Sequence, residues 1–205
     1  PALGPEGYIN IVSGNGAVVS DDKGNDYIDA MASLWYCNVG YSRREVIEAI
    51  TTQLNKIPAY HVFGPFANEP SEQLAARIAA LAPVDDARVF FGSSGSESVD
   101  TALKIARAAQ IHAGHPEKQI VISRSAGYHG TNYGGTSAQG IPPNREGYGT
   151  LLANVVQVDP DDIEAMSLLM SQNAHRLAAV ITEPLQGAGG VFPPKEGYLQ
   201  QLRKL

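Results

Sequence analysis

The sequence predicts an α/β domain built on a mostly parallel β-sheet with helices on both of its faces. In the second half of the chain, short apolar runs that suit buried strands alternate with segments of helical periodicity. This alternation is typical of β-α-β units, whose crossovers place helices against the sheet. With 205 residues, of which 43% are apolar, the chain can also bury a substantial core.

The first forty residues are expected to form short strands. An apolar run at 16–19 and a second run at 26–29 are separated by a turn-rich stretch that contains Gly24-Asn25. A glycine-containing turn between two short apolar runs indicates a β-hairpin.

Two helices are expected next. Ser42 is followed three residues later by Glu45, a pattern that suggests a capping box, and apolar residues then recur at helical spacing until Pro58 ends the helix. The second helix is expected from about residue 69 to residue 81, before Pro83.

The remaining elements alternate between strand and helix. The predicted strands are 88–91, 120–123, 154–158 and 178–182, and the predicted helices are 96–113, one that opens at Asp159-Pro160, and one that begins near Glu196. Right-handed crossovers place the carboxyl ends of such strands at one edge of the sheet, where ligands bind. The stretch 124–150 holds seven glycines and little periodicity, and a loop of this length in a compact domain is generally functional or disordered.

Composition excludes several classes of function. The net charge is −6 and no Lys/Arg-rich run exists, which argues against a nucleic-acid partner. A single cysteine, Cys37, allows no internal disulfide, and no apolar stretch is long enough to span a membrane. We therefore expect a cytoplasmic protein without a metal site, and both ends of the chain look cut, with no targeting peptide visible.

The strongest local signal for chemistry is the run from Phe90 to Glu97, which passes from a strand candidate directly into a helix. A Gly/Ser turn at a helix N-terminus offers free backbone N–H groups, hydroxyl donors and the positive end of the helix dipole. These are the groups that hold a phosphate. An ordinary serine N-cap explains the same residues, so both interpretations stay open at this point.

Two weaker signals follow other predicted strands. Gly127-Tyr128-His129-Gly130 would let the backbone approach a ligand, and a tyrosine face can stack on a planar ring, although packing explains Tyr128 equally well. Glu183 follows the strand 178–182 and precedes a glycine-rich loop, which places a carboxylate at the ligand edge. A solvated glutamate at a strand end is the alternative.

Four segments, in order along the chain, resemble the class III aminotransferases, the omega-aminotransferase group of fold-type I pyridoxal-phosphate (PLP) enzymes. They are the opening hairpin 22–29, the phosphate segment 90–107 (FFGSSGSESVDTALKIAR), Tyr128-His129-Gly130, and 181–198 (ITEPLQGAGGVFPPKEGY). The resemblance implies the fold-type I architecture, with residues 1–58 contributing to the small domain and the active-site entrance. Residues 59–205 would then be the first part of the large PLP-binding domain, incomplete at its C-terminus.

The resemblance also implies roles for individual residues. Ser94, Gly95 and Ser96 would hold the PLP phosphate. Tyr128 would stack on the pyridine ring, with His129 beside it and Glu183 near the ring edge. Trp35 and Tyr60 would line the substrate pocket. The family residues at Ser98 and Val99 are commonly Ala and Asn, a departure that we expect to affect packing.

The family's Schiff-base lysine and the aspartate that pairs with the pyridine nitrogen have no counterpart here. Of the six lysines only Lys104 closely follows the Gly/Ser turn of the phosphate segment, and a surface position suits it better. The resemblance thus implies transamination between an amine or omega-amino acid and a keto acid such as pyruvate by a complete homodimeric enzyme, and no catalytic residue in this chain. The alternatives are a PLP- or phosphate-binding module without turnover, and another fold-type I activity such as an aminomutase or a decarboxylase.

Overall fold

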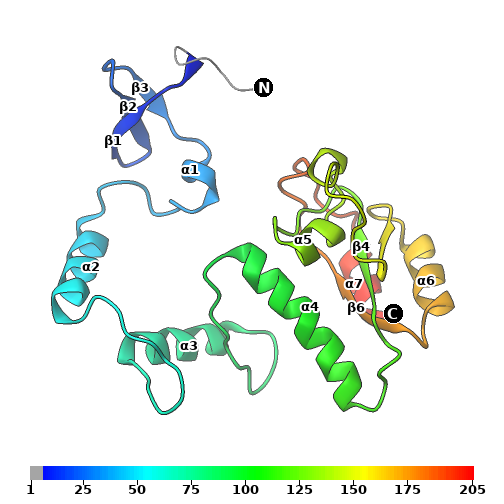
Figure 1. Cartoon of the computed structure of the whole chain (residues 1–205). Coiled ribbons are helices and arrows are strands. Elements are labelled where there is room, and N and C mark those ends of the chain that lie inside the picture. Colours follow the sequence, from blue (N-terminus) through cyan, green and yellow to red (C-terminus); the bar gives the residue numbers. More distant parts are fainter. Residues whose placement is uncertain (1–6) are drawn as a thin grey trace. The chain divides into compact units, whose positions relative to one another are not determined.

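A computed structural model describes residues 7–205, and the chain divides into two compact units (Figure 1). One unit ends at Arg88 and the other is Val89–Leu205. The predicted domain boundary after residue 58 concerns the complete family fold and stays a prediction.

The first unit contains a small antiparallel sheet in the order β1-β2-β3, formed by β1 (Ile11–Asn15), β2 (Val18–Asp21) and β3 (Asp26–Ile28). The predicted hairpin is therefore confirmed, with a further strand before it. Asp21 closes the turn, because its carboxylate accepts hydrogen bonds from the main-chain N–H groups of Lys23 and Asn25. Hydrogen bonds from the side chain and the backbone of Asn25 lower the pKa of Asp21 to about 2.

Three helices follow in this unit: α1 (Ala32–Trp35), α2 (Arg44–Lys56) and α3 (Glu69–Leu81). The predicted capping box at the start of α2 is wrong. Ser42 has a left-handed backbone (φ 58°), and its hydroxyl donates to the Gly14 carbonyl at 2.7 Å, so it fastens the chain to β1 instead of capping the helix. The predicted helix 69–81 is confirmed, and the Asn68 side chain caps it.

The second unit is built on a parallel sheet in the order β5-β4-β6, with β4 (Ile120–Arg124) between β5 (Val155–Val158) and β6 (Leu177–Ile181). Four helices accompany the strands: α4 (Gly95–His112), α5 (Tyr133–Ala138), α6 (Ile163–Gln172) and α7 (Tyr198–Lys204). The predicted parallel sheet and its strands at 120–123, 154–158 and 178–182 are confirmed to within a residue or two.

The two faces of this sheet are covered by different helices (Figure 1). Alternate β4 residues point to opposite faces. Ile120 and Ile122 pack with Val158 of β5 and Met166 of α6 to form the buried core, and Leu202 of α7 packs against it. On the other face, Val121 lies with residues of α4 and α5. Helices thus lie on both faces, as the sequence predicts.

The predicted buried strand at 88–91 is wrong. These residues belong to neither sheet of the described residues, and Phe90 is 67% exposed. An apolar run becomes a strand only when a neighbouring strand satisfies its backbone N–H and C=O groups, and no such neighbour lies within residues 7–205.

Two boundaries differ from expectation. The glycine-rich stretch 124–150 is not entirely a loop, since it holds α5 and a 3₁₀ turn at Pro142–Asn144. The helix expected at Asp159-Pro160 begins at Ile163, because the carboxylate of Asp162, rather than that of Asp159, accepts the N–H of Ala165 at 2.8 Å.

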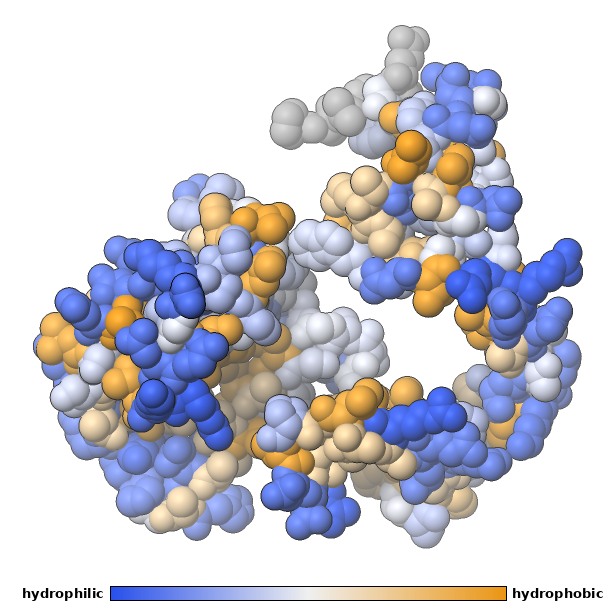
Figure 2. Space-filling model, turned by 180° about the vertical axis from the view of Figure 1, so that it is seen from behind, coloured by the Kyte–Doolittle hydropathy of each residue, from blue (hydrophilic) through white to orange (hydrophobic). Residues whose placement is uncertain are grey.

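Large apolar side chains are exposed on both units (Figure 2). Ile28, Phe63 and Leu81 in the first unit are each more than 80% exposed, and α2 and α3 contain no buried residue. Helices of this length are rarely stable in water without packing against an apolar partner.

Candidate functional site

The N-terminus of α4 presents donor groups to solvent. Ser94 caps this helix by accepting the N–H of Glu97 at 3.1 Å, and the Glu97 carboxylate accepts the N–H of Ser93 at 2.8 Å. The serine N-cap is therefore real. It does not exclude anion binding, because the N–H groups of Gly95 and Ser96 lie in the first turn, where no intrahelical acceptor exists.

The loop after β4 closes over this helix terminus. The N–H of Thr131 donates to the Ser96 hydroxyl at 2.9 Å, and the two hydroxyl oxygens lie 3.3 Å apart. Gly130 makes the approach possible. Its φ is +94°, and a Cβ atom there would lie 2.8 Å from Ser96 Cα. Thr131 joins the site although the sequence analysis did not select it; its position directly after Gly130 was the available signal.

Glu183 connects two loops at the carboxyl edge of the sheet. One carboxylate oxygen accepts the N–H of Tyr128 at 2.7 Å, and the other accepts the N–H of Gly187 at 3.1 Å. The side chain is thus engaged with backbone donors and is not a freely solvated strand-end carboxylate. It fixes Tyr128, which is half-buried, relative to the end of β6.

His129 is buried, with 5% of its surface exposed, and its Nε2 atom has no hydrogen-bond partner among the described residues. Burial lowers the pKa of His129 below its ordinary value, and the Arg124 guanidinium acts in the same direction, while the Glu183 carboxylate opposes both. The imidazole therefore favours its neutral form, with an unpaired polar atom that a group from outside the described residues can satisfy.

Arg124 is the main residue that the sequence analysis missed. It is 1% exposed at the end of β4, where its guanidinium donates to the Glu183 carbonyl at 2.8 Å and lies 3.4 Å from the Asp161 carboxylate. The signal in the sequence was an arginine two residues after the apolar run 120–122, because buried arginines are rare unless they are paired.

The described groups fit a phosphate ester carried on a planar ring. Free N–H groups and the hydroxyls of Ser94, Ser96 and Thr131 lie at the N-terminus of α4. Thr131 belongs to the same loop after β4 as Tyr128. Two hydrogen bonds link the segments that hold the predicted cofactor residues: Thr131 N–H to Ser96, and Tyr128 N–H to Glu183. Their roles toward a ligand stay predictions.

The two predicted substrate residues belong to the first unit. Tyr60 stacks on His61 with ring centroids 4.6 Å apart and lines a cavity of about 330 Å³ with residues of α2 and the start of α3. Trp35 ends α1 and is 55% exposed. Their role in a substrate pocket stays a prediction.

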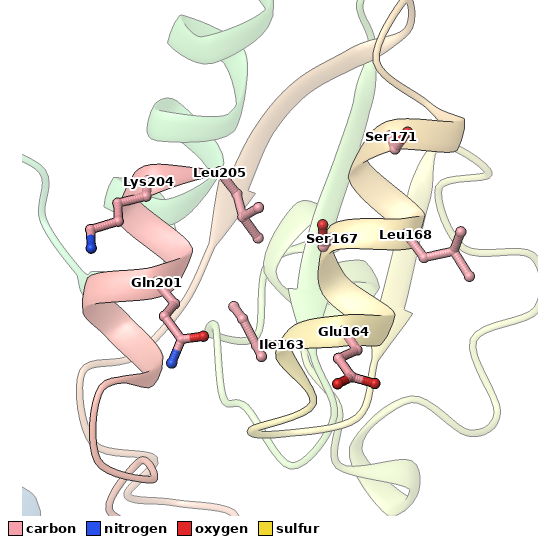
Figure 3. Close-up of a pocket in the computed structure, with 8 residues that line it drawn as sticks. All are labelled: Ile163, Glu164, Ser167, Leu168, Ser171, Gln201, Lys204 and Leu205. Atoms are coloured by element: carbon pink, nitrogen blue, oxygen red, sulfur yellow. The ribbon is translucent and has the colours of Figure 1, made fainter.

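Other cavities of the second unit lie away from the predicted residues. A cavity of about 630 Å³ lies between α6 and α7, where Ile163 and Gln201 face one another (Figure 3). Exposed Lys104 lines a separate cavity of about 270 Å³ between α4, α5 and the sheet. Within residues 7–205, no group of three or more His, Cys, Asp or Glu side chains could hold a metal ion. No helix among those residues is both long and apolar enough to cross a membrane.

Comparison with known proteins gives consistent matches over nearly the whole chain. The family model described as Aminotransferase class-III matches residues 4–205. Among curated proteins, the beta-alanine–pyruvate aminotransferase of Pseudomonas aeruginosa is 38% identical over 95% of this chain and 47% of its own length. The putrescine–pyruvate aminotransferase of the same species is 34% identical over 99% of this chain and 48% of its own.

Solved structures give the same picture. An amine transaminase from an uncultivated Pseudomonas species, described as PLP-bound, superposes with a TM-score of 0.92 and 32% identity. The match covers 100% of this chain and 51% of that one. The chain thus spans about half the length of the proteins that it matches.

Proposed function

Because the chain belongs to the class-III aminotransferase family, we propose that it forms the phosphate- and ring-binding part of a PLP-dependent transaminase. In the complete protein, the reaction transfers an amino group from an amine or omega-amino acid to a keto acid such as pyruvate. The observation that carries the proposal is the convergence of three segments distant in sequence, joined by the Ser96–Thr131 and Tyr128–Glu183 hydrogen bonds.

Phosphate binding is assigned to the α4 terminus. This terminus offers directional hydrogen-bond donors, namely the N–H groups of Gly95 and Ser96 and the hydroxyls of Ser94, Ser96 and Thr131. The helix dipole adds a favourable electrostatic potential for an anion. Gly130 keeps side-chain bulk away from this terminus. These groups anchor the cofactor without taking part in proton transfer.

Ring binding is assigned to Tyr128, His129 and Glu183. Tyr128 supplies an aromatic face, and Glu183 holds its backbone by accepting its N–H. Bound PLP supplies an electron-accepting ring that stabilises carbanion charge during amino-group transfer. The chain's own contribution is to orient that ring and to keep the buried His129 imidazole neutral beside it.

The names of the relatives support the substrate classes. Beta-alanine is an omega-amino acid, putrescine is an amine, and pyruvate is named as the second substrate of both relatives. We extend these classes to the complete protein. A homodimer in the cytoplasm, with Trp35 and Tyr60 lining the substrate pocket, belongs to the same proposal.

Two measurements on the complete protein that carries this sequence test the proposal. Incubation with PLP followed by borohydride reduction is expected to give an intact mass increased by one reduced cofactor per chain. Incubation with beta-alanine or putrescine and pyruvate is expected to give alanine in proportion to the amino donor consumed. A cofactor adduct without alanine would favour a PLP-binding protein without turnover of these substrates, and the absence of any adduct would contradict the proposal.

A further inference from the structure

The Arg124 side chain contacts three segments of the chain that are distant in sequence. Its guanidinium reaches the carbonyl of Glu183, which follows β6, and the carboxylate of Asp161, which precedes α6. Its guanidinium carbon lies over the Tyr198 ring of α7, 5.1 Å from the ring centroid. One side chain thus contacts the segments that follow β5 and β6 and the start of α7.

Because the Arg124 charge is buried, its contacts with Glu183 and Asp161 are important for stability. Arg124 is 1% exposed, and removing a guanidinium from water is unfavourable unless charge-assisted hydrogen bonds replace its hydration. The Asp161 side chain is 17% exposed, so the ion pair is also mostly shielded from salt. Loss of the Arg124 side chain would leave the Glu183 carbonyl and the mostly buried Asp161 carboxylate without this donor.

Glu183 links Arg124 to the loop that contains Tyr128. Its main-chain carbonyl accepts from Arg124, while its side-chain carboxylate accepts the N–H groups of Tyr128 and Gly187. Arg124 and Tyr128 are only four residues apart, and both donate a hydrogen bond to Glu183. The short segment between them is therefore held to the same residue at both of its ends. The orientation of Tyr128 therefore depends on where Arg124 holds the backbone of Glu183.

We propose that Arg124 is a positioning residue that fixes the aromatic face of Tyr128 toward the cofactor through the main-chain carbonyl of Glu183. The inference rests on the proposed function for its ligand, but the link from Arg124 to Tyr128 stands on contacts within this chain. Arg124 touches no reacting atom in this assignment.

The experiment compares Arg124→Met, Arg124→Lys and the control Arg107→Met in the complete protein. Arg107 is a matched control because its side chain also donates to a main-chain carbonyl, that of Gln119 at 3.0 Å, at the opposite end of β4. Three quantities are measured for each protein: hydrogen–deuterium exchange without cofactor, the Kd for PLP, and the visible circular dichroism of bound PLP, which reports the orientation of its ring.

In Arg124→Met, we expect faster exchange in the segments 125–132 and 184–190, with exchange in α4 unchanged. The Kd for PLP is expected to rise about tenfold, as for loss of a charged hydrogen bond, and the dichroism of the bound cofactor to change. Arg124→Lys, which keeps the charge and one donor, should recover part of each effect. Arg107→Met should alter none of the three.

Two outcomes would overturn the inference. One is exchange at 125–132 that stays at the wild-type rate in both Arg124 variants. The other is a lower melting temperature in these variants with wild-type dichroism of bound PLP, which would make Arg124 a purely structural residue. If Arg124→Met does not fold, Arg124→Lys decides on the same readouts. Failure of the wild-type protein to bind PLP would contradict the proposed function, while the exchange data would still test the link from Arg124 to Tyr128.

Discussion

The main-chain amide of Thr131 donates a hydrogen bond to the hydroxyl of Ser96 at 2.9 Å, across 35 positions of sequence. This bond joins the loop after β4 to the first turn of α4. It places two hydroxyls beside the free N–H groups of a helix terminus, which is the arrangement that an anionic group requires.

Gly130→Ala should break the junction. The added Cβ would lie 2.7 Å from the Ser96 hydroxyl oxygen, and the backbone at φ +94° disfavours any side chain. We expect the variant to lose more than about 1 kcal/mol of stability and to bind PLP at least about tenfold more weakly. Thermal melting and a PLP titration measure the two effects. Gly114→Ala is the control, because Gly114 has a similar φ of +86° with no heavy atom near its Cβ position, so it should lower stability and leave PLP binding unchanged.

Ser94→Ala should separate capping from ligand binding. The variant loses the bond from the Glu97 N–H and with it about 1 kcal/mol of stability. Asp162→Ala removes the equivalent cap of α6 and should cost a similar amount. Only Ser94→Ala is expected to weaken PLP binding as well, because only that cap lies at the proposed phosphate site. Equal PLP affinity in the two variants would remove Ser94 from the site.

Glu183→Gln should loosen both loops that the carboxylate holds. The amide group has a single acceptor oxygen, so the N–H of either Tyr128 or Gly187 loses its partner and faces an NH₂ donor instead. We expect about 1–3 kcal/mol of lost stability together with weaker PLP binding, measured by urea unfolding and cofactor titration. The exposed Glu164→Gln in α6 serves as the control and should match the wild type in both assays.

His129 should make stability depend on pH. Its pKa in the folded protein lies below the ordinary value of 6.5, so the unfolded chain takes up a proton at a higher pH than the folded one. The free energy of unfolding is therefore expected to fall as the pH drops from about 6.5 through the lowered pKa of the folded state. Melting curves across this range should show the decline in the wild type and less of it in His129→Gln. An equal decline in His129→Gln and in the exposed control His175→Gln would show that another group is responsible.

Local sequence patterns were sufficient for many elements of the second unit. The strands 120–123 and 178–182 are apolar runs of the right length, and the helix 96–113 shows its cap, Ser94, together with a regular apolar face. Such features depend on residues a few positions apart, so they can be recognised without knowledge of the fold. The six predicted cofactor residues also lie next to such elements, but their roles were predicted from the resemblance to the aminotransferase family.

Two of the failed predictions share one physical reason. Phe90 and Phe91 form an apolar run that suits a strand, but a strand also needs a partner for its backbone, and the pattern contains no information about that partner. Ser42 and Glu45 have the spacing of a capping box, yet the Ser42 hydroxyl bonds to Gly14, 28 positions earlier. The local structure was decided by a distant partner in both cases: the partner strand is lacking for Phe90 and Phe91, and the distant acceptor is present for Ser42.

The sequence by itself determined the α/β class, the alternation of strands and helices, and the family of this protein. Periodicity and ordered motifs are properties of neighbouring residues, so they can be read without the fold. Only the tertiary structure decided that Thr131 joins Ser96, that Glu183 holds the amides of Tyr128 and Gly187, and that Arg124 is buried against Glu183 and Asp161. These contacts join residues that are 35 to 59 positions apart, except for the one within the Glu183 loop. They form because the parallel sheet brings the carboxyl ends of β4, β5 and β6 to one edge, where buried polar groups must find partners in each other.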